Sequence, residues 1–564
     1  MFKVLFVCGL IVGVQSNITK LVNITQGPVL GYKAQDAEVF EFYGIPYATA
    51  PTGRDKFKEP LPAPVWTETF NATDKETICP QFPHSFVVTG KTMKEDCLVA
   101  NVFVPDTENK NLPVLVIVHG GAFIMGFGSA DSPKQLVNSK KVIAVNFNYR
   151  LGPHGFLCLG SEDIPGNAGM KDQVALLHWV KENIKDFGGN PDDVTVAGCS
   201  AGGGSVDLLL ISKMTKGLFQ RAIVMSGANV AALATQADPI ENARDYATRI
   251  NYDGNDYDSL VEFYKNATLD QLNSQLFPLL AAPDTNVLFT PCIERDVGGK
   301  RFLHDSPVNI IKNGDYERYP MLYGFSNMEG LFRNFFFDAF VNPMNKNFAD
   351  FLPFDLEFKN EEERQEVAKK IKEFYFGDQL VSNETSIHYV DFFSDSMFIY
   401  PMQRSVKLQV NSNNTDIFLF VYSFVDENSD NVPHSDVQGA THCAAANAAM
   451  GEDESHHTPE YTIMKQKMRQ VWLDFITTGN PTPNGSPVPT WTPAGADRAP
   501  CMDFGNTIQM QGTFEKNRTE FWDEIYNEYY RQPMPPSVPS SSSSMSSILG
   551  ISIFVFVTLV PVLL

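Results

Sequence analysis

The sequence predicts an α/β fold in which helices flank a central, mostly parallel β-sheet. Strand-like and helix-like segments alternate through the first half of the 564-residue chain, and several of the strands end in glycine-rich turns. Residues 142–149, 194–197 and 221–225 are rich in β-branched and apolar side chains and are predicted strands, whereas 167–187 repeats apolar residues on one helical face. The second half is more helical, and its charged segment 361–374 predicts an exposed helix.

The predicted strand at 194–197 ends in a tight turn around Ser200. The turn reads Gly198-Cys199-Ser200-Ala201-Gly202 and leads into an apolar helical run at 206–211. A strand-to-helix turn of this kind lifts its central hydroxyl away from the backbone, and the following amide, on Ala201, can donate to a developing oxyanion. Similar small-residue strings occur as ordinary turns, but the position between a strand and a helix favours a nucleophile at Ser200.

A second glycine turn follows the continuous apolar run 112–119. It reads His119-Gly120-Gly121-Ala122-Phe123, which is the form of the loop that supplies the remaining oxyanion amides in α/β-hydrolases. The alternative is a plain glycine turn at a strand end. Two such turns, each placed after a buried strand as that fold requires, predict an α/β-hydrolase with Gly120, Gly121 and Ala122 in its oxyanion hole. We expect His119 to support this loop rather than to act as a base.

Beyond these turns, the chain resembles the type-B carboxylesterases, a family that includes cholinesterases, juvenile hormone esterases and the non-catalytic neuroligins. The resemblance spans 28–522 and is closest in character to insect secreted esterases. Its most specific segments are 95–98 (Glu-Asp-Cys-Leu), 101–103 (Asn-Val-Phe), 148–152 (Asn-Tyr-Arg-Leu-Gly), 166–173 (Gly-Asn-Ala-Gly-Met-Lys-Asp-Gln) and 187–191 (Phe-Gly-Gly-Asn-Pro). It implies a serine carboxylic ester hydrolase that works through an acyl-enzyme, and a buried ion pair between Arg150 and Asp172.

The chain order of catalytic residues in this fold is Ser, then Asp or Glu, then His. Glu329, in Tyr-Gly-Phe-Ser-Asn-Met-Glu-Gly (323–330), follows a strand-like stretch and resembles the acidic member of the family's triad. His442, in Gly-Ala-Thr-His (439–442), lies where the family places its general base. His434 is the nearest competitor, but its Val-Pro-His-Ser-Asp setting indicates a polar surface loop. The resemblance therefore implies Ser200, Glu329 and His442 as the catalytic residues.

Two cysteines beside these residues depart from the family's pattern. Cys199 precedes Ser200 and Cys443 follows His442, in places where the family commonly has acidic residues. Because Ser200 and His442 must lie close together for catalysis, we hypothesise that Cys199 and Cys443 form a disulfide. The alternative is two small buried thiols, which are common core residues.

The other cysteines are only partly assigned. Cys79 and Cys97 match the family's first disulfide, which closes a small surface loop in an oxidising compartment. The chain has eight cysteines, one of them near the N-terminus in a predicted leader, so at least one of the other seven has no partner within the chain. The sequence assigns no partner to Cys158, Cys292 or Cys501.

The composition limits the partners of this protein. A net charge of −22 at pH 7 excludes nucleic acid and anionic membrane surfaces. No His pair or Cys cluster has convincing zinc-ligand spacing, so no metal or cofactor is expected.

The expected substrate is a small uncharged ester. Choline esters are disfavoured, because the loop between Cys79 and Cys97 lacks the tryptophan that binds choline in cholinesterases. A juvenile hormone esterase is also disfavoured, because Cys199 replaces the Gln typical of that group.

The two ends of the chain carry predicted targeting signals. Residues 1–16 combine a lysine, an apolar run and a small-residue end, which predicts a secretory signal peptide. The hydrolase domain is expected at 17–532, followed by a Pro- and Ser-rich linker at 533–547 and an apolar tail at 548–564 that predicts a GPI-attachment signal. A transmembrane anchor is the weaker alternative, because the tail is short for a span. We expect a protein that is secreted or held at the extracellular face of the plasma membrane.

Eight Asn-x-Ser/Thr sequons accompany the predicted signal peptide, so we expect N-glycosylation. The sequon at Asn484 is weakened by the nearby Pro487. The other seven asparagines are Asn17, Asn23, Asn71, Asn266, Asn383, Asn413 and Asn517.

Two other functions are compatible with the sequence. An anchored, acidic, glycosylated ectodomain also suits an adhesion or binding protein on the same fold, as in the neuroligins, although such relatives typically lose a catalytic residue. A sequestering esterase that is acylated but turns over slowly is the second alternative, because acids near His442 are missing.

The expected partners are a small-molecule ester and, through the C-terminal tail, a membrane. The oligomeric state is left open.

Overall fold

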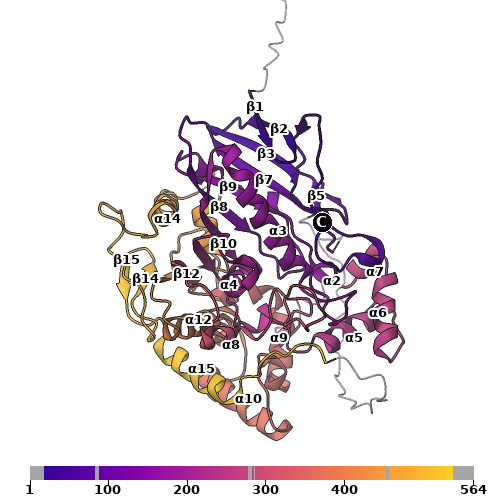
Figure 1. Cartoon of the computed structure of the whole chain (residues 1–564). Coiled ribbons are helices and arrows are strands. Elements are labelled where there is room, and N and C mark those ends of the chain that lie inside the picture. The colour runs from indigo at the N-terminus through magenta and orange to yellow at the C-terminus, as the bar shows by residue number, and fades with distance from the viewer. Residues whose placement is uncertain (1–17, 83–87, 277–281, 285, 453–456, 538–564) are drawn as a thin grey trace, which may run out of the picture.

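The computed structural model describes residues 18–82, 88–276, 282–284, 286–452 and 457–537. Within these residues thirteen strands form one sheet, in the order β1-β2-β3-β7-β9-β8-β10-β11-β12-β13-β14-β15, with β4 paired to β2. Figure 1 shows β1, β2 and β3 at the top of the molecule and β14 and β15 at its left-hand edge. The helices and strands alternate through the first half as the sequence predicts, so the α/β class is confirmed.

The strands of the described residues are Thr19–Ile24 (β1), Gly27–Lys33 (β2), Val39–Pro46 (β3), Phe70–Asn71 (β4), Thr77–Ile78 (β5), Thr92–Met93 (β6), Val99–Pro105 (β7), Leu112–Val118 (β8), Ile143–Phe147 (β9), Gly189–Cys199 (β10), Arg221–Met225 (β11), Met321–Ser326 (β12), Ile417–Tyr422 (β13), Cys501–Phe504 (β14) and Ile508–Gln511 (β15).

The α-helices of the described residues are Lys134–Val137 (α1), Gly152–Phe156 (α2), Ala168–Asn183 (α3), Ala201–Ile211 (α4), Pro239–Arg249 (α5), Tyr257–Asn266 (α6), Leu269–Asn273 (α7), Pro307–Asn313 (α8), Phe337–Lys346 (α9), Glu361–Phe376 (α10), Ser386–Ser394 (α11), Tyr400–Asn411 (α12), Ala444–Met450 (α13), Pro459–Thr478 (α14) and Lys516–Tyr529 (α15).

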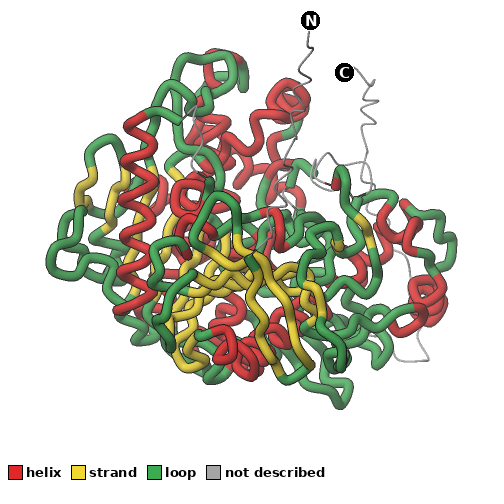
Figure 2. Tube along the Cα trace, turned by 90° about the horizontal axis from the view of Figure 1, so that it is seen from above, coloured by secondary structure: helices red, strands yellow, loops and turns green. Residues whose placement is uncertain are grey.

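The middle of the sheet is parallel and buried on both faces. β8 pairs in parallel with β9 and β10, and the parallel pairing continues from β10 through β14. Figure 2 shows helices on both sides of the strands. Along β8, Val116 belongs to one hydrophobic cluster and its neighbours Leu115 and Ile117 to the other, because successive strand residues point to opposite faces. Covering both faces explains the continuous apolar run of this strand.

The observed elements depart from the predicted limits by a few residues. The predicted helix at 167–187 is α3 followed by a 3-10 turn, Ile184–Phe187, which ends where Gly188 adopts a left-handed φ of 96°. The predicted strand at 194–197 is longer and begins at Gly189. The charged helix predicted at 361–374 is α10.

The carboxyl ends of four parallel strands lie together at one edge of the sheet. In register, Val118 of β8 lies beside Gly198 of β10, Cys199 beside Met225 of β11, and Met225 beside Gly324 of β12. Loops that leave this edge of a parallel sheet share one crevice, which is where open α/β folds bind ligands. The segments that carry the predicted catalytic residues therefore start from a common edge.

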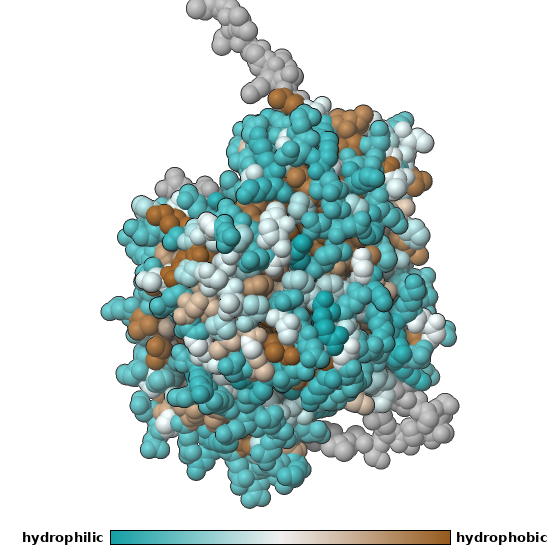
Figure 3. Space-filling view, turned by 60° about the vertical axis from the view of Figure 1, so that its left-hand side comes forward, coloured by the Kyte–Doolittle hydropathy of each residue, from teal (hydrophilic) through white to brown (hydrophobic). Residues whose placement is uncertain are grey.

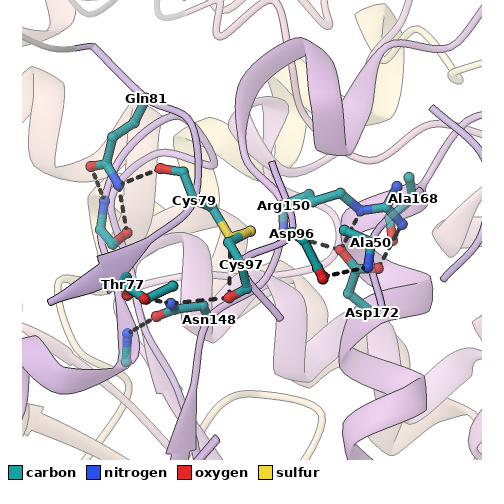
Figure 4. Close-up of a disulfide and its surroundings, with 12 residues drawn as sticks. Ala50, Thr77, Cys79, Gln81, Asp96, Cys97, Asn148, Arg150, Ala168 and Asp172 are labelled. Atoms are coloured by element: carbon teal, nitrogen blue, oxygen red, sulfur yellow. Dashed lines mark hydrogen bonds and ion pairs between the residues drawn. A yellow bond between two sulfur atoms is a disulfide. The ribbon is translucent and has the colours of Figure 1, made fainter. Parts of the chain in front are cut away.

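A buried ion pair and a disulfide brace this part of the fold, as Figure 4 shows. The Arg150 guanidinium donates to both carboxylate oxygens of Asp172, at 2.8 and 2.6 Å, and both side chains are almost fully buried. This is the ion pair that the family resemblance implies. Nearby, Asn148 Nδ2 donates to the carbonyl oxygens of Thr77 and Cys97, at 2.8 and 3.2 Å, which ties the disulfide loop to the sheet.

The outer surface is mainly polar. Figure 3 shows hydrophilic residues over most of one face, with a paler, more apolar area near its middle. Among the residues that the structure describes, no helix is both long and apolar enough to cross a membrane. The predicted signal peptide at 1–16 and the apolar tail at 548–564 lie outside the described residues.

Candidate active site

Ser200 lies at the turn between β10 and α4. Its φ and ψ of 61° and −128° are a strained conformation for a residue with a side chain, and its backbone N–H donates to Met225 O at 3.0 Å. The turn is tight: a Cβ at Gly198 would lie 2.3 Å from Gly202 O, and one at Gly202 would lie 2.2 Å from Val118 O. Only glycine fits at these two positions, which explains the small residues on both sides of Ser200.

Glu329 begins the 3-10 helix Glu329–Phe336 (η8), three residues after β12. Its carboxylate is fully buried, and Oε1 accepts hydrogen bonds from Ser226 Oγ at 2.6 Å and from the backbone N–H of Ser326 at 2.7 Å. These two donors hold Oε1 in place, and the second carboxylate oxygen, Oε2, faces His442. The glutamate is thus held by the ends of two neighbouring strands, β11 and β12.

Ser226 bonds to Glu329 in this site, although the sequence analysis did not single it out. It follows β11 directly and has a left-handed φ of 48°, and its N–H donates to Gly324 O at 2.9 Å. The signal was present in the sequence: Ser226-Gly227 is a small-residue turn after a buried strand, like the turn at Ser200. A Cβ at Gly227 would lie 2.2 Å from Ser200 O, so the two turns lie against each other.

The His442 imidazole meets the Glu329 carboxylate. Nδ1 of His442 lies 2.6 Å from Glu329 Oε2, while Nε2 is buried and has no hydrogen-bond partner among the described residues. The ring packs against Phe398 and Phe332, with centroid distances of 4.3 and 5.3 Å. His434, the competing histidine, is instead an exposed residue 3.2 Å from an Asp338 oxygen. The structure therefore brings His442, and not His434, to Glu329.

The glycine loop after β8 lies against Ser200. A Cβ at Gly120 would be only 3.2 Å from the Ser200 Cβ, and Gly121 and Ala122 adopt left-handed φ angles of 111° and 53°. Within the described residues, the N–H groups of Gly121, Ala122 and Ala201 donate to no acceptor. Unpaired backbone donors beside a hydroxyl are the arrangement that stabilises a tetrahedral oxyanion.

His119 is buried beneath this loop. Its Nδ1 lies 2.8 Å from Gly120 O, and its ring stacks on Tyr149 at a centroid distance of 4.3 Å. Burial lowers the pKa of His119 to about 4, so the ring is neutral at physiological pH. The residue thus braces the glycine loop, and among the described residues no hydrogen bond or ion pair joins its side chain to Ser200 or Glu329.

Three disulfides lie within the described residues. Cys79 pairs with Cys97, and Cys199 pairs with Cys443, with Cα–Cα distances of 5.0 and 6.0 Å. The third, which the sequence analysis left unassigned, joins Cys158 to Cys292 across 134 residues. Spacing along the chain gave no signal for this pair, because it is created by the packing of distant loops. Cys501 is a buried free thiol, and burial raises its pKa.

The chain is similar to known proteins over most of its length. The chain matches the carboxylesterase family over residues 18–522. Esterase FE4 of Myzus persicae is 31% identical over 522 residues, which cover 88% of this chain and 90% of that protein. The juvenile hormone esterase of Heliothis virescens is 32% identical over 473 residues, covering 78% and 82%.

Solved structures show the same relationship. The crystal structure of juvenile hormone esterase from Manduca sexta, with OTFP covalently attached, superposes with a TM-score of 0.81 at 30% identity, covering 90% of this chain and all of that one. A PNB esterase superposes with a TM-score of 0.68 at 28% identity and covers 90% of this chain. These likenesses confirm the α/β-hydrolase fold and the similarity to insect esterases. The chain therefore belongs to the carboxylesterase family and is a carboxylic ester hydrolase.

Proposed function

We propose that this hydrolase cleaves uncharged carboxyl esters through a Ser200–Glu329–His442 triad and an acyl-enzyme. The observation that carries the proposal is the 2.6 Å contact between His442 Nδ1 and Glu329 Oε2, made next to a serine on a strained strand-to-helix turn. A carboxylate at Nδ1 holds the imidazole in the tautomer whose Nε2 can take a proton. The pairing thus supports His442 as the general base for Ser200.

The reaction follows from these roles. Ser200 Oγ forms a bond to the ester carbonyl carbon as His442 Nε2 takes its proton, and the carbonyl oxygen becomes an oxyanion held by the N–H groups of Gly121, Ala122 and Ala201. Gly120 contributes to this hole by allowing its loop to approach the serine. The alcohol leaves with the proton from His442, giving an acyl-serine. Water, activated by the same imidazole, then releases the carboxylic acid.

The surroundings of His442 favour uncharged substrates. Phe398 and Phe332 form apolar walls beside the imidazole, and Phe332 is 40% exposed, so an apolar group of the ester can reach it. The sequence between Cys79 and Cys97 contains no tryptophan for a quaternary ammonium group. The substrate class proposed is therefore aliphatic or aromatic carboxyl esters of small alcohols or phenols.

Hydrolysis of p-nitrophenyl acetate and butyrate by the full-length protein, beside its Ser200→Ala variant, tests the proposal. We expect steady turnover that the variant abolishes. A single burst equal to the enzyme concentration would favour the sequestering alternative. No acylation of a folded protein would contradict the proposed mechanism and favour a binding role like that of the neuroligins.

We further propose that the protein is secreted, glycosylated and GPI-anchored. Of the seven favoured sequons, the six asparagines within the described residues are all exposed, which supports glycan attachment: Asn23, Asn71, Asn266, Asn383, Asn413 and Asn517. Three disulfides fit an oxidising compartment. Release from intact cells by phosphatidylinositol-specific phospholipase C is the expected result, and retention after complete digestion of a control anchored protein would contradict the anchor.

A further inference from the structure

Ser200 and His442, the proposed nucleophile and base, lie on segments that differ in regular structure. Ser200 is fixed between a central strand, β10, and a buried helix, α4. His442 instead comes near the end of residues 423–443, which hold neither helix nor strand beyond one isolated bridge. A histidine on such a segment can be placed accurately only if other contacts hold it.

Close to His442, the hydrogen bonds of the histidine segment lead toward Glu329, whereas its first residues, Ser423 and Val425, bond to Phe504 and Asn506. The Ala440 N–H donates to Asn327 Oδ1 at 2.9 Å, the Met328 N–H donates to Ala440 O at 3.2 Å, and His442 Nδ1 contacts Glu329 itself. In the described part of the chain no hydrogen bond or ion pair joins 423–443 to the turn at 198–204. The direct connection between them is the Cys199–Cys443 disulfide.

We propose that the Cys199–Cys443 disulfide is a positioning element that holds the His442 imidazole within reach of Ser200. The inference rests on the proposed triad and names a further pair of residues on which it depends. One cysteine directly precedes the nucleophile and the other directly follows the histidine, so the bond fixes the separation of the two segments across 244 residues of chain. The hydrogen bond to Glu329 orients the ring, and the disulfide sets its distance from the hydroxyl.

Two details of the site support this role. Nε2 of His442 is buried and has no hydrogen-bond partner among the described residues, so no other group holds this nitrogen in place or competes for it. Both Ser200 and Cys443 adopt left-handed φ angles, 61° and 65°, which persist only where the surroundings over-determine them. A displacement of about 1 Å between reacting groups can lower a rate about 100-fold.

The bond is also the most accessible of the three disulfides. Cys199 is 9% exposed and Cys443 is only partly buried, whereas the four cysteines of the other two disulfides are at most 1% exposed. Exposed disulfides are the ones that reductants reach first. A water-soluble phosphine would break it by forming phosphine oxide from water as the two sulfurs become thiols.

The test compares two full-length double variants. Cys199→Ala with Cys443→Ala removes the proposed positioning bond. Cys158→Ala with Cys292→Ala removes a disulfide whose cysteines bond to Pro165 and Asn167 and, among the described residues, form no hydrogen bond with the triad. The two bonds close loops of 244 and 134 residues, and the chain-entropy effect of a cross-link depends only on the logarithm of this length. Both variants should therefore lose similar stability, and any difference in kcat reports on positioning.

With p-nitrophenyl butyrate we expect kcat to fall at least 10-fold in the Cys199/Cys443 variant while KM stays within twofold of the wild-type value. In the Cys158/Cys292 variant both constants should stay within twofold. A Cys199/Cys443 variant with wild-type kcat overturns the positioning role while the Ser200→Ala control upholds the triad. A wild-type protein without Ser200-dependent turnover overturns both.

A second measurement applies if the double variant is not secreted. Wild-type protein is titrated with a water-soluble phosphine, and kcat is followed beside the fraction of each disulfide reduced, read by mass spectrometry of peptides alkylated in parallel samples. We expect kcat to fall in step with reduction of Cys199–Cys443, before the other two bonds open. Full reduction of that bond with kcat retained contradicts the proposal.

Discussion

His442 Nδ1 lies 2.6 Å from Glu329 Oε2, although 113 residues separate the two in the chain. The other oxygen of the same carboxylate accepts hydrogen bonds from Ser226 Oγ and from the Ser326 N–H. All three donors approach a carboxylate with no exposed surface. In such a buried site a fixed negative charge stabilises a neighbouring imidazolium far more than it would in water, so this contact carries much of the proposed catalytic effect.

Replacement of Glu329 tests that charge directly. Glu329→Gln keeps the shape but removes the charge, and its single amide oxygen can accept from Ser226 or from His442 but not from both, because the NH2 group only donates. We expect kcat for p-nitrophenyl butyrate to fall by about 10⁴-fold, the effect of the equivalent change in a serine protease triad. Glu361→Gln, an exposed substitution at the start of α10, is the control. A loss of less than 10-fold would exclude Glu329 from the triad.

Ser226 is expected to act through Glu329. Ser226→Ala removes a hydrogen bond to a buried carboxylate, which is typically worth about 1.5–3 kcal/mol, so kcat should fall about 10- to 100-fold with little change in KM. Ser405→Ala, at a buried serine that contacts Asp207 and Asn229 instead, serves as the comparison and should leave kcat unchanged. Equal kcat values for the two variants would show that Ser226 does not position the glutamate.

The Arg150–Asp172 pair should contribute mainly to stability. Asp172→Ala leaves the Arg150 guanidinium buried without its counter-charge, and breaking such a pair costs about 3–5 kcal/mol. Lys359→Ala removes an exposed partner of Glu363 and should leave the urea midpoint nearly unchanged, because water screens a surface pair. Urea unfolding of both variants measures the difference. Equal midpoints would contradict the special importance of the buried pair.

His154 should make the fold sensitive to acid. Burial and the charges of Lys56 and Arg150 lower its pKa to about 3, and neither ring nitrogen has a hydrogen-bond partner among the described residues. Below the unfolded-state pKa of about 6.5 the unfolded chain therefore binds a proton that the folded protein does not. The stability contributed by the neutral ring is present above pH 6.5 and is lost as the pH falls from there toward 3.

His154→Phe removes this titration while keeping an apolar ring near Phe57. At pH 7.5 the free energies of unfolding of variant and wild type should be similar, and at pH 5 the variant should be more stable by roughly 2 kcal/mol relative to that baseline. Urea unfolding at the two pH values gives the comparison. Parallel pH dependences would mean that His154 is protonated in the folded state.

Local steric demands made much of the site predictable. The glycines beside Ser200 and the pair Gly120-Gly121 are required because the backbone approaches other atoms closely there. A requirement of this kind appears in the sequence as a short local pattern of glycines. The apolar run of β8 likewise follows from its burial on both faces. Glu329 and His442 came from the resemblance to a family, because a single glutamate or histidine carries no local pattern of its own.

The sequence by itself therefore determined the α/β alternation and the two glycine turns, at Ser200 and at residues 119–123. The tertiary structure alone decided that Ser226 reaches Glu329, that Phe398 packs on His442, and that Cys158 pairs with Cys292. The physical reason is the range of the interaction. A turn or a buried strand constrains residues adjacent in the chain, whereas a hydrogen bond or disulfide across more than 100 residues exists only once the sheet has aligned the strand ends that carry it.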